Sequence, residues 1–334
     1  MGINYNNKSS LKKNSYSSIS TYDQCGFKYY LQYVLGNYIY KPSLASEFGT
    51  LCHWILQHIG LDLKNGVVPN YEQYKKDFYD LDIPKKDKYD TEGGVFGIKI
   101  LQKKYTREFF EGNKDGVSFQ SKAEDFVNRG MYRLESILRD YYLGHYQVWG
   151  CEQYFDVIIA NHRFSGKIDR ILYNPEDDRY IIEDIKTKDH PFKDSELVTP
   201  LQFVIYVKAL CDMLGIKESQ IECAYDLPIC HEYQPAGSKG FVKRGVEKIT
   251  KMFQCIDAQQ FEPNPSPLCW WCQFNHGNPD APKEGKGLCP YYSLWRPDHK
   301  TFDVANLWEG MERHKIIVKR LDNDETDCKI DIDF

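Results

Sequence analysis

The chain has 334 residues, of which 42% are hydrophobic and 27% charged, and its net charge is −5. This length and composition predict a folded protein of one large domain or two ordinary ones and exclude a disordered chain. Residues 1–18 lack the apolar core of a signal peptide, and no apolar stretch approaches the roughly 20 residues that span a bilayer. We therefore expect an intracellular, cytoplasmic protein without a membrane partner, and a phage-encoded protein fits the same description.

The first half of the chain is predicted to be helical. Residues 1–16 are predicted to form a flexible, mildly basic arm, and residues 17–145 a helical section. Within that section, the positions of apolar residues, capping residues and glycines predict helices, at about residues 18–35, 45–59, 71–79, 95–111 and 121–143.

Strands dominate the next segment, residues 146–260, which we predict to be the core of the fold. Apolar runs predict strands at about 151–160, 163–173, 179–187 and 221–227, with helices at about 197–214 and 240–258. A cysteine-rich cap is predicted at 261–298, and a short helix with an acidic tail at 299–334. A helical section followed by β-β-β-α-β predicts an α/β fold, with helices flanking a mixed central sheet.

Two carboxylates and a lysine fall at the tips of two adjacent predicted strands. Asp169 ends the run Gly166-Lys167-Ile168-Asp169, and Asp184 and Lys186 follow the apolar run Tyr180-Ile181-Ile182. Residues two apart on a strand share a face, so Asp184 and Lys186 point the same way. Two acidic groups hold a hard cation such as Mg²⁺, and a nearby lysine stabilises charge or orients a water. This combination suits metal-assisted hydrolysis of a phosphodiester.

The alternative for these strands is an ordinary β-hairpin with a solvated face. Ile168, Ile171 and the Ile181–Ile182 pair are expected to be buried, however. Carboxylates flanked by buried apolar residues need a partner or a metal, which favours the metal site.

These motifs resemble the PD-(D/E)XK nuclease superfamily. Gly-x-x-Asp-Arg, a turn and an apolar strand ending in Asp-Ile-Lys-Thr form the pattern of its catalytic strands. The chain is most similar to the RecB-like exonuclease branch, which includes the nuclease domains of AddAB and the CRISPR-adaptation nucleases. The resemblance implies a restriction-endonuclease-like core. Further matches follow in family order over residues 18–290: Ser18-x-Ser20 with Cys25-Gly26-Phe27-Lys28-Tyr29-Tyr30-Leu31, Gly49-x-x-x-His53, Gln202-x-x-x-Tyr206 and a split set of cysteines.

The resemblance implies a catalytic Mg²⁺ or Mn²⁺ ion held by Asp169, Asp184, the main-chain carbonyl of Ile185 and His53. On spacing alone, His53 would instead be a core histidine of an amphipathic helix. Glu152, near the start of the preceding strand, either reaches the metal or remains solvated, and both readings stay open.

Three further residues are predicted to act around this ion. Lys186 is expected to orient or deprotonate the attacking water, or to stabilise the charge of the transition state. Gln202 and Tyr206, one helical turn apart, would hold the scissile phosphate or support Lys186, with core packing as the alternative for Tyr206. Glu183 is left out of the site, because it should point to the opposite face of its strand.

The cysteines Cys25, Cys269, Cys272 and Cys289 resemble the split iron–sulfur site of this branch, and the resemblance implies a [4Fe–4S] cluster. The interval between Cys272 and Cys289 is longer than in the family, and it contains His276. A structural Zn²⁺ site is therefore the alternative, and a loop with reduced thiols is the third option. Most other cysteines, Cys255 and Cys328 included, are expected to be free thiols.

DNA, as ends or single strands, is the predicted substrate. Local positive charge is enough for this despite the acidic balance of the chain, and aromatic side chains can stack on unpaired bases. The candidates are Lys12, Lys13, Lys28, Lys103, Lys104 and Arg107 for phosphates, and Tyr29, Tyr30 and Tyr105 for bases. The C-terminus, Ile330-Asp331-Ile332-Asp333-Phe334, resembles the acidic tails of single-strand DNA-binding proteins. We expect it to dock a replication partner or to shield the basic groove, the alternative being a disordered tail.

The sequence thus predicts a metal-dependent DNA exonuclease of recombination, repair or phage-type DNA processing. No G-x-x-x-x-G-K-[ST] run is present, so unwinding would need a partner such as a helicase. The rival is a non-catalytic DNA-binding or scaffold subunit of a helicase–nuclease or replication complex. The intact set of Asp169, Asp184 and Lys186 argues against it. A restriction-type endonuclease is less favoured, because no target-recognition domain is evident.

Overall fold

The computed structural model describes residues 11–37, 42–86, 90, 93–112, 116–275, 283 and 286–289, with the backbone of 295–296 and 301–302. The chain divides into two compact units. Unit 1 comprises Met1–Tyr16 and Pro42–Ile249, and unit 2 comprises Ser17–Lys41 and Thr250–Phe334. The predicted acidic tail and the C-terminal helix, from residue 303 onward, lie outside the described residues, as does His276.

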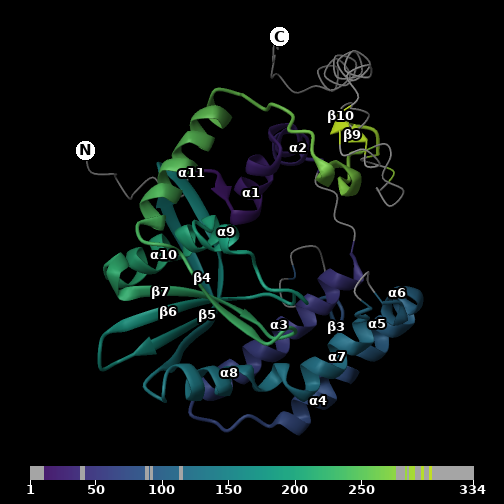
Figure 1. Ribbon diagram of the computed structural model, residues 1–334, viewed down its shortest axis with the longest axis vertical. Helices are drawn as coiled ribbons and strands as arrows, with labels where there is room; N and C mark the ends of the chain where they lie inside the picture. Colours follow the sequence, from purple (N-terminus) through teal and green to yellow (C-terminus); the bar gives the residue numbers. More distant parts are fainter. Residues whose placement is uncertain are drawn as a thin grey trace. The chain divides into compact units, whose positions relative to one another are not determined.

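Unit 1 is built on one mixed sheet, which confirms the predicted α/β class (Figure 1). The strand order is β1-β5-β6-β7-β8, and β4 pairs with β5. Strands β5 and β6 are antiparallel, whereas β6 and β7 are parallel. The strands are β1 (Lys13–Asn14), β4 (Gln147–Ile159), β5 (His162–Asn174), β6 (Arg179–Ile185), β7 (Ile221–Leu227) and β8 (Glu232–Ala236).

Two tight turns set the register of the three strands that carry the predicted site. Ala160 and Asn161, between β4 and β5, have φ angles of 50° and 65°. Two successive residues in this left-handed region are typical of the turns that match the twist of a hairpin. Between β5 and β6, the side-chain Oδ1 of Asn174 accepts a hydrogen bond of 2.9 Å from the backbone N–H of Glu176. Such an Asn-based turn fixes where both strands end.

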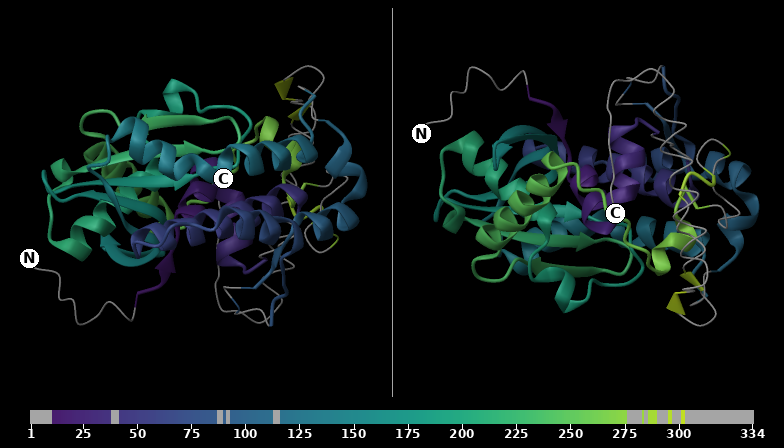
Figure 2. Two further views of the ribbon diagram at one scale, coloured as in Figure 1. Left: turned by 90° about the horizontal axis from the view of Figure 1, so that it is seen from below. Right: turned by 90° about the horizontal axis from the view of Figure 1, so that it is seen from above.

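Helices flank this sheet (Figure 2). Helix α3 (Leu44–Lys64) starts at a capping box in which Ser43 and Ser46 cap each other. Helix α10 (Leu201–Leu214) ends at Gly215, whose φ of 68° suits glycine. The short helix α9 (Asp194–Leu197) precedes α10, and α11 (Phe241–Asp257) follows β8. The predicted helices at 45–59, 197–214 and 240–258 are thus present, although the second is interrupted before Leu201.

Two predicted helices are broken into shorter pieces. One break lies before Gly130, where an added Cβ would lie 2.8 Å from the Phe126 ring and 3.0 Å from the Pro228 carbonyl oxygen. A larger residue would therefore not fit between these segments. The pieces are α5 (Ile98–Lys104), α6 (Thr106–Phe110), α7 (Phe119–Asn128), η3 (Gly130–Tyr132), α8 (Arg133–Ser136) and η4 (Ile137–Tyr141). The predicted helix at 71–79 is present as α4 (Tyr71–Asp80), and it is followed by the hairpin of β2 (Asp82–Ile83) and β3 (Val95–Phe96).

Two strands differ from the sequence prediction. Lys13 and Asn14 lie in the predicted arm but form β1, which pairs in parallel with β5. The buried Asn14 side chain also donates a hydrogen bond of 3.2 Å to the Arg163 carbonyl. Strand β8 was not predicted, because Glu232–Ala236 lacks an apolar run. Both strands are stabilised by pairing with distant segments rather than by their own side chains.

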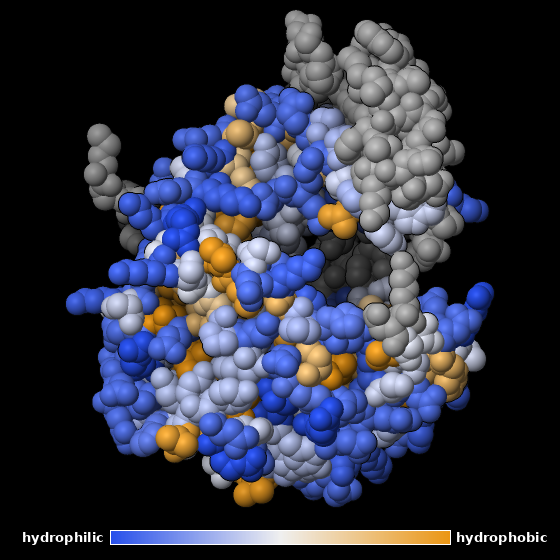
Figure 3. Space-filling view, in the orientation of Figure 1, coloured by the Kyte–Doolittle hydropathy of each residue, from blue (hydrophilic) through white to orange (hydrophobic). Residues whose placement is uncertain are grey.

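One helical stretch within the described residues is apolar enough to cross a membrane by length and composition, contrary to the sequence expectation. This stretch is Asp194–Leu214, with a mean hydropathy of 1.5, and 56% of it is buried inside the protein. Buried core helices pass the same test, and α10 is such a helix. Hydrophilic residues cover most of the described surface seen in Figure 3.

Unit 2 contains α1 (Tyr16–Gln24), α2 (Gly26–Tyr29), η2 (Tyr30–Val34), η6 (Pro267–Trp271) and the hairpin β9 (Trp295–Arg296) and β10 (Thr301–Phe302). The predicted helix at 18–35 is therefore broken at Cys25, which caps α2. Two segments of this unit, one on each side of unit 1 in the sequence, meet at Gly26, where an added Cβ would lie 2.8 Å from the Glu262 carbonyl oxygen. An apolar cluster of Phe27, Tyr30, Leu31 and Phe274 holds the segments together.

Candidate active site

Three carboxylates form a row across β4, β5 and β6. The pairing of Arg170 with Glu183 places the preceding Asp169 opposite Asp184. The pairings on either side of Glu152, which join β4 to β5, place Glu152 opposite Asp169 in the same way. Side chains that face each other across neighbouring strands lie on one face of the sheet. The row therefore concentrates negative charge at one place in unit 1.

Helix α3 brings His53 to this row. Its Nδ1 lies 3.8 Å from Asp169 Oδ2 and 3.9 Å from Glu152 Oε1. Within the described part of the chain, these three residues are the group of potential ligands whose donor atoms all lie within 4.8 Å of one another. Burial lowers the pKa of His53, but the negative charges of Asp169 and Glu152 outweigh this effect and raise it above its ordinary value.

Glu152 has a backbone conformation that is rare for a glutamate, with a φ of 47°. It follows a register shift in β4 between Val148 and Gly150. Bulges of this kind re-aim side chains next to functional sites, and a left-handed non-glycine residue is strained unless its surroundings enforce it. The irregularity turns the Glu152 carboxylate toward His53 and Asp169.

Gly49, one helical turn before His53, lets α3 approach the end of β6. A Cβ at Gly49 would lie 3.3 Å from Thr187 Oγ1, closer than most contacts of this kind. Thr187 directly follows Lys186. Gly49 and His53 are four residues apart and therefore lie on one face of α3, so the face that packs closely against Thr187 also carries the His53 imidazole.

Asp184 is fully buried and held on both sides. Its Oδ1 accepts a hydrogen bond of 2.8 Å from Gln202 Nε2, and its Oδ2 lies 2.5 Å from Lys186 Nζ. Burial, with the negative charge of Asp169 as a second cause, raises the pKa of Asp184 from 3.8 to about 7. The Lys186 ammonium opposes this shift but does not cancel it.

Lys186 is charged at neutral pH. Burial lowers its pKa, but the carboxylates of Asp184 and Asp169 outweigh burial and raise it above the ordinary value. Of the roles expected from the sequence, orientation of a water and stabilisation of negative charge fit this environment, and deprotonation of the water stays a prediction.

Gln202 and Tyr206 lie behind Asp184 on α10. Gln202 Nε2 donates to the Tyr206 hydroxyl at 2.8 Å as well as to Asp184. The Tyr206 ring packs edge-on against Phe155 with centroids 5.6 Å apart, and burial raises the pKa of its hydroxyl. Both residues therefore orient Asp184, and no contact described for them reaches Lys186.

The donor set fits a divalent cation with oxygen and nitrogen ligands. The separations of 3.8 and 3.9 Å between His53 Nδ1 and the two carboxylate oxygens are within the span of opposite ligands around Mg²⁺ or Mn²⁺, about 4 Å. The backbone N–H of Ile185 donates a hydrogen bond of 2.7 Å to Asp169 Oδ2. Its carbonyl remains a predicted ligand. The structure thus adds Glu152 beside His53 and Asp169, while Asp184 bonds to Gln202 and Lys186.

We expect the affinity for Mn²⁺ to fall below pH 7 by about tenfold per pH unit for each proton that the metal displaces, and so by up to about a hundredfold where two groups are protonated. A carboxyl with a pKa near 7 must lose its proton before it binds a metal, and the His53 imidazolium must do the same. Isothermal titration at pH 8, 7 and 6, in buffers of different ionisation enthalpy, measures both the affinity and the protons released. An affinity that does not change with pH would contradict this assignment.

The opposite face of the same strands carries a buried ionic network. Arg170 donates from Nε to Glu183 and from a terminal nitrogen to Asp226 Oδ2 at 2.8 Å. Tyr233 donates to Glu183 Oε1 at 2.6 Å, and Arg133 Nε lies 3.4 Å from Asp226 Oδ1. Arg170, Glu183 and Asp226 are at most 1% exposed. Glu183 thus faces away from the row, as its strand position predicts.

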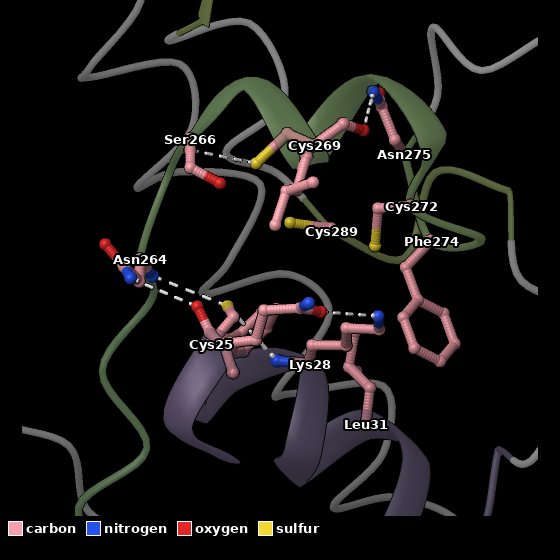
Figure 4. A pocket seen from close by; sticks show the side chains of 13 residues that line it. Cys25, Lys28, Leu31, Asn264, Ser266, Cys269, Cys272, Phe274, Asn275 and Cys289 are labelled. Carbon is pink, nitrogen blue, oxygen red and sulfur yellow. Dashed lines mark hydrogen bonds between the residues drawn. The ribbon is translucent and has the colours of Figure 1, made fainter. Parts of the chain in front are cut away.

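In unit 2, the sulfurs of Cys25, Cys269, Cys272 and Cys289 face one pocket (Figure 4). Backbone N–H groups point at Cys25 and Cys269, and Cys272 also accepts backbone hydrogen bonds. Cys25 Sγ accepts from Lys28 at 3.5 Å and from Asn264 at 3.4 Å, and Cys269 Sγ accepts from Ser266 at 3.3 Å. Hydrogen bonds of this kind stabilise a sulfur that carries negative charge, as in a metal thiolate.

The four thiols do not form a compact group in the described part of the chain. Zn–S bonds of about 2.3 Å hold four sulfurs about 3.8 Å apart. Among the described residues, no three of these sulfurs lie within 4.8 Å of one another. Burial raises the pKa of Cys269 and of Cys272, so both are neutral thiols unless a metal replaces their protons.

Comparison with known proteins decides the family. The model of the PD-(D/E)XK nuclease superfamily matches residues 13–276, a range that holds the carboxylate row, His53 and three of the four cysteines. The chain belongs to the PD-(D/E)XK nuclease superfamily. The mixed sheet flanked by helices is accordingly a restriction-endonuclease-like fold.

Two solved structures are similar to this nuclease-superfamily chain, but only distantly. The first, described as "Putative exonuclease" from Eubacterium rectale, is 12% identical with a TM-score of 0.40, covering 82% of this chain and 92% of its own. The second, SSO0001, is 16% identical with a TM-score of 0.24, covering 55% of this chain and 81% of its own. Similarity at this level assigns no function. No curated protein matches the sequence significantly.

Proposed function

We propose that the chain is a metal-dependent deoxyribonuclease, an exonuclease of the RecB-like type that hydrolyses phosphodiester bonds in DNA. The observation that carries this proposal is the row of Glu152, Asp169 and Asp184 with Lys186 at its end, in a chain of a nuclease superfamily. Recombination, repair or phage-type DNA processing is the setting we infer for it.

In this proposal, His53, Glu152 and Asp169, with Asp184 and the Ile185 carbonyl, hold Mg²⁺ or Mn²⁺. The ion supplies Lewis-acid activation of a water and of the phosphoryl oxygen when it is bound. Lys186 stabilises the negative charge that develops on the phosphate, because Asp184 fixes its ammonium while its side chain stays 35% exposed to an incoming substrate. Gln202 keeps the Asp184 carboxylate in one orientation, and Tyr206 keeps Gln202 in place.

The test is cleavage of single- and double-stranded DNA labelled at either end, with Mn²⁺, Mg²⁺ or EDTA. Metal-dependent degradation that is lost in Asp184→Ala and kept in Asp178→Ala, an acid of the β5–β6 turn, supports the nuclease. The product ladder gives the polarity and separates exonuclease from endonuclease. Intact DNA binding without cleavage by the wild type would favour the non-catalytic binding subunit.

We further propose that the four cysteines hold a [4Fe–4S] cluster rather than zinc. Their wide separation and the N–H groups directed at Cys25 and Cys269 support this choice. The cluster would join the two ends of the chain within unit 2 and stabilise it by closing a long loop.

Protein purified without oxygen should contain about four irons and four acid-labile sulfides per chain. Cys269→Ser should lose most of both, because one thiolate ligand is removed from a buried site. Cys255→Ser, also in unit 2 but away from the pocket lining, should keep them. One zinc per chain without labile sulfide would contradict the cluster and support the zinc site instead.

A further inference from the structure

A cleft of about 450 Å³ in unit 1 opens beside the three-residue metal group. One wall is α3, which presents Gly49, Thr50, Trp54 and Gln57 around His53. The other wall is formed by Glu152, Lys167 and Asp169 from β4 and β5. Trp54 and Lys167 have no role in holding the metal, yet they line the same space.

Trp54 is a fixed aromatic surface in this cleft. Its ring stacks on His58, one turn further along α3, with centroids 3.8 Å apart and planes 30° apart. His58 is itself held, since its Nδ1 lies 2.7 Å from the Trp54 carbonyl oxygen. Part of the Trp54 side chain packs against the helical core. A ring held in this way loses little entropy when a flat ligand stacks on it.

Lys167 supplies a cation on the same side of the cleft. It lies two residues before Asp169 on β5, so both side chains point to one face. Its Nζ is 3.8 Å from Glu152 Oε2, too far for a hydrogen bond, and its side chain is 42% exposed. The ammonium is therefore accessible to an anion that enters beside the carboxylates.

We propose that Trp54 and Lys167 form a nucleotide subsite next to the metal group. An unpaired base stacks on Trp54, and the adjacent phosphate binds Lys167. Stacking on an aromatic side chain requires a base that is free of its partner. The subsite therefore selects single strands, or ends whose bases have come apart, over intact duplex. The nucleic-acid ligand rests on the proposed nuclease function.

The test is equilibrium binding in EDTA, measured by fluorescence anisotropy, with a labelled thymidine oligonucleotide and an abasic strand of equal length. Trp54→Ala should weaken binding of the thymidine strand by about 5- to 100-fold and leave the abasic strand unchanged. Trp54→Phe should retain most of the affinity. Lys167→Met should weaken both strands and reduce the dependence of log affinity on log salt by about 0.7.

Trp149→Ala is the matched control, because Trp149 lies on β4 next to Tyr180 and does not line the cleft. Equal losses on both strands in Trp54→Ala, or equal effects of Trp54→Ala and Trp149→Ala, would overturn the subsite. If the wild type cleaves DNA but either of these two results is found, the subsite is wrong and the nuclease proposal stands. Absence of cleavage with a base-dependent loss in Trp54→Ala would overturn the nuclease proposal and retain the subsite.

Discussion

Replacing Asp184 with asparagine is expected to abolish cleavage and to stabilise the metal-free protein. Folding raises the pKa of this carboxyl from 3.8 to about 7. The folded state therefore holds the proton more tightly, and stability is lost as pH rises from about 4 through 7. Three pKa units correspond to on the order of 4 kcal/mol. Because Lys186 loses a partner in the variant, we expect a net gain of about 1–3 kcal/mol at pH 8.

An asparagine at this position keeps the hydrogen bonds but removes the charge. Gln202 can rotate its amide so that its oxygen accepts from the new NH₂ group, and the Asn oxygen then faces Lys186. Without the carboxylate, the site loses a metal ligand and several kcal/mol of transition-state stabilisation, a loss of roughly 1000-fold in rate.

Urea unfolding at pH 8 and pH 5 in EDTA, beside rate measurements in Mn²⁺, tests both halves of this expectation. The gain in stability should shrink at pH 5, where the wild-type carboxyl is already protonated. Asp178→Asn, on the exposed turn of the same hairpin, should change neither stability nor rate. An Asp184→Asn protein that is less stable than the wild type at pH 8 would contradict the burial of a destabilising charge.

Local patterns were sufficient to predict the strands and the residues at their tips. The apolar run before Asp184 and the turn residues after Asn174 fix β5 and β6 almost to the residue. The two-residue period then places Asp184 and Lys186 on one face, and the structure shows them in contact. The same period correctly predicts that Glu183 points to the other face, where it pairs with Arg170.

Local patterns in the sequence did not settle the long-range geometry in three places. The sequence left open whether Glu152 reaches the metal; the structure places it with His53 and Asp169, at a strand irregularity and a positive φ that no neighbouring residue signals. Strand β1 exists because of its pairing with β5. The buried partnership of Arg170 with Asp226 joins residues far apart in the chain, and no local pattern links them.

Replacing Arg170 with methionine is expected to destabilise the protein by about 3–5 kcal/mol. Removal of one partner leaves Glu183 and Asp226 buried without their main counter-charge, which is far more costly than loss of an exposed pair. Burial already raises the pKa of Glu183, and Arg170 opposes that shift. Without Arg170, this pKa should rise further, so the loss of stability should be greater at pH 8 than at pH 5.5. Urea unfolding at both pH values measures it.

Arg179→Met provides the matched control on the same sheet. Arg179 pairs with Glu222 at 2.5 Å, but both side chains are more than 40% exposed. An exposed pair contributes about 0–1 kcal/mol, so this variant should remain near the wild type. The second change Glu183→Gln should restore part of the stability of Arg170→Met, because it removes one uncompensated charge. Equal, small effects of Arg170→Met and Arg179→Met would show that the network contributes little.

Arg170→Met should also weaken metal binding, because residues of the ionic network and of the carboxylate row are neighbours on the same strands. Asp169 precedes Arg170, Asp184 follows Glu183, and the Lys186 N–H donates to the Asp226 carbonyl at 3.0 Å. Each member of the network therefore fixes the backbone of a residue at or next to the row. At a temperature where Arg170→Met is fully folded, Mn²⁺ affinity should fall by about tenfold or more. Unchanged affinity in the folded variant would limit Arg170 to stability alone.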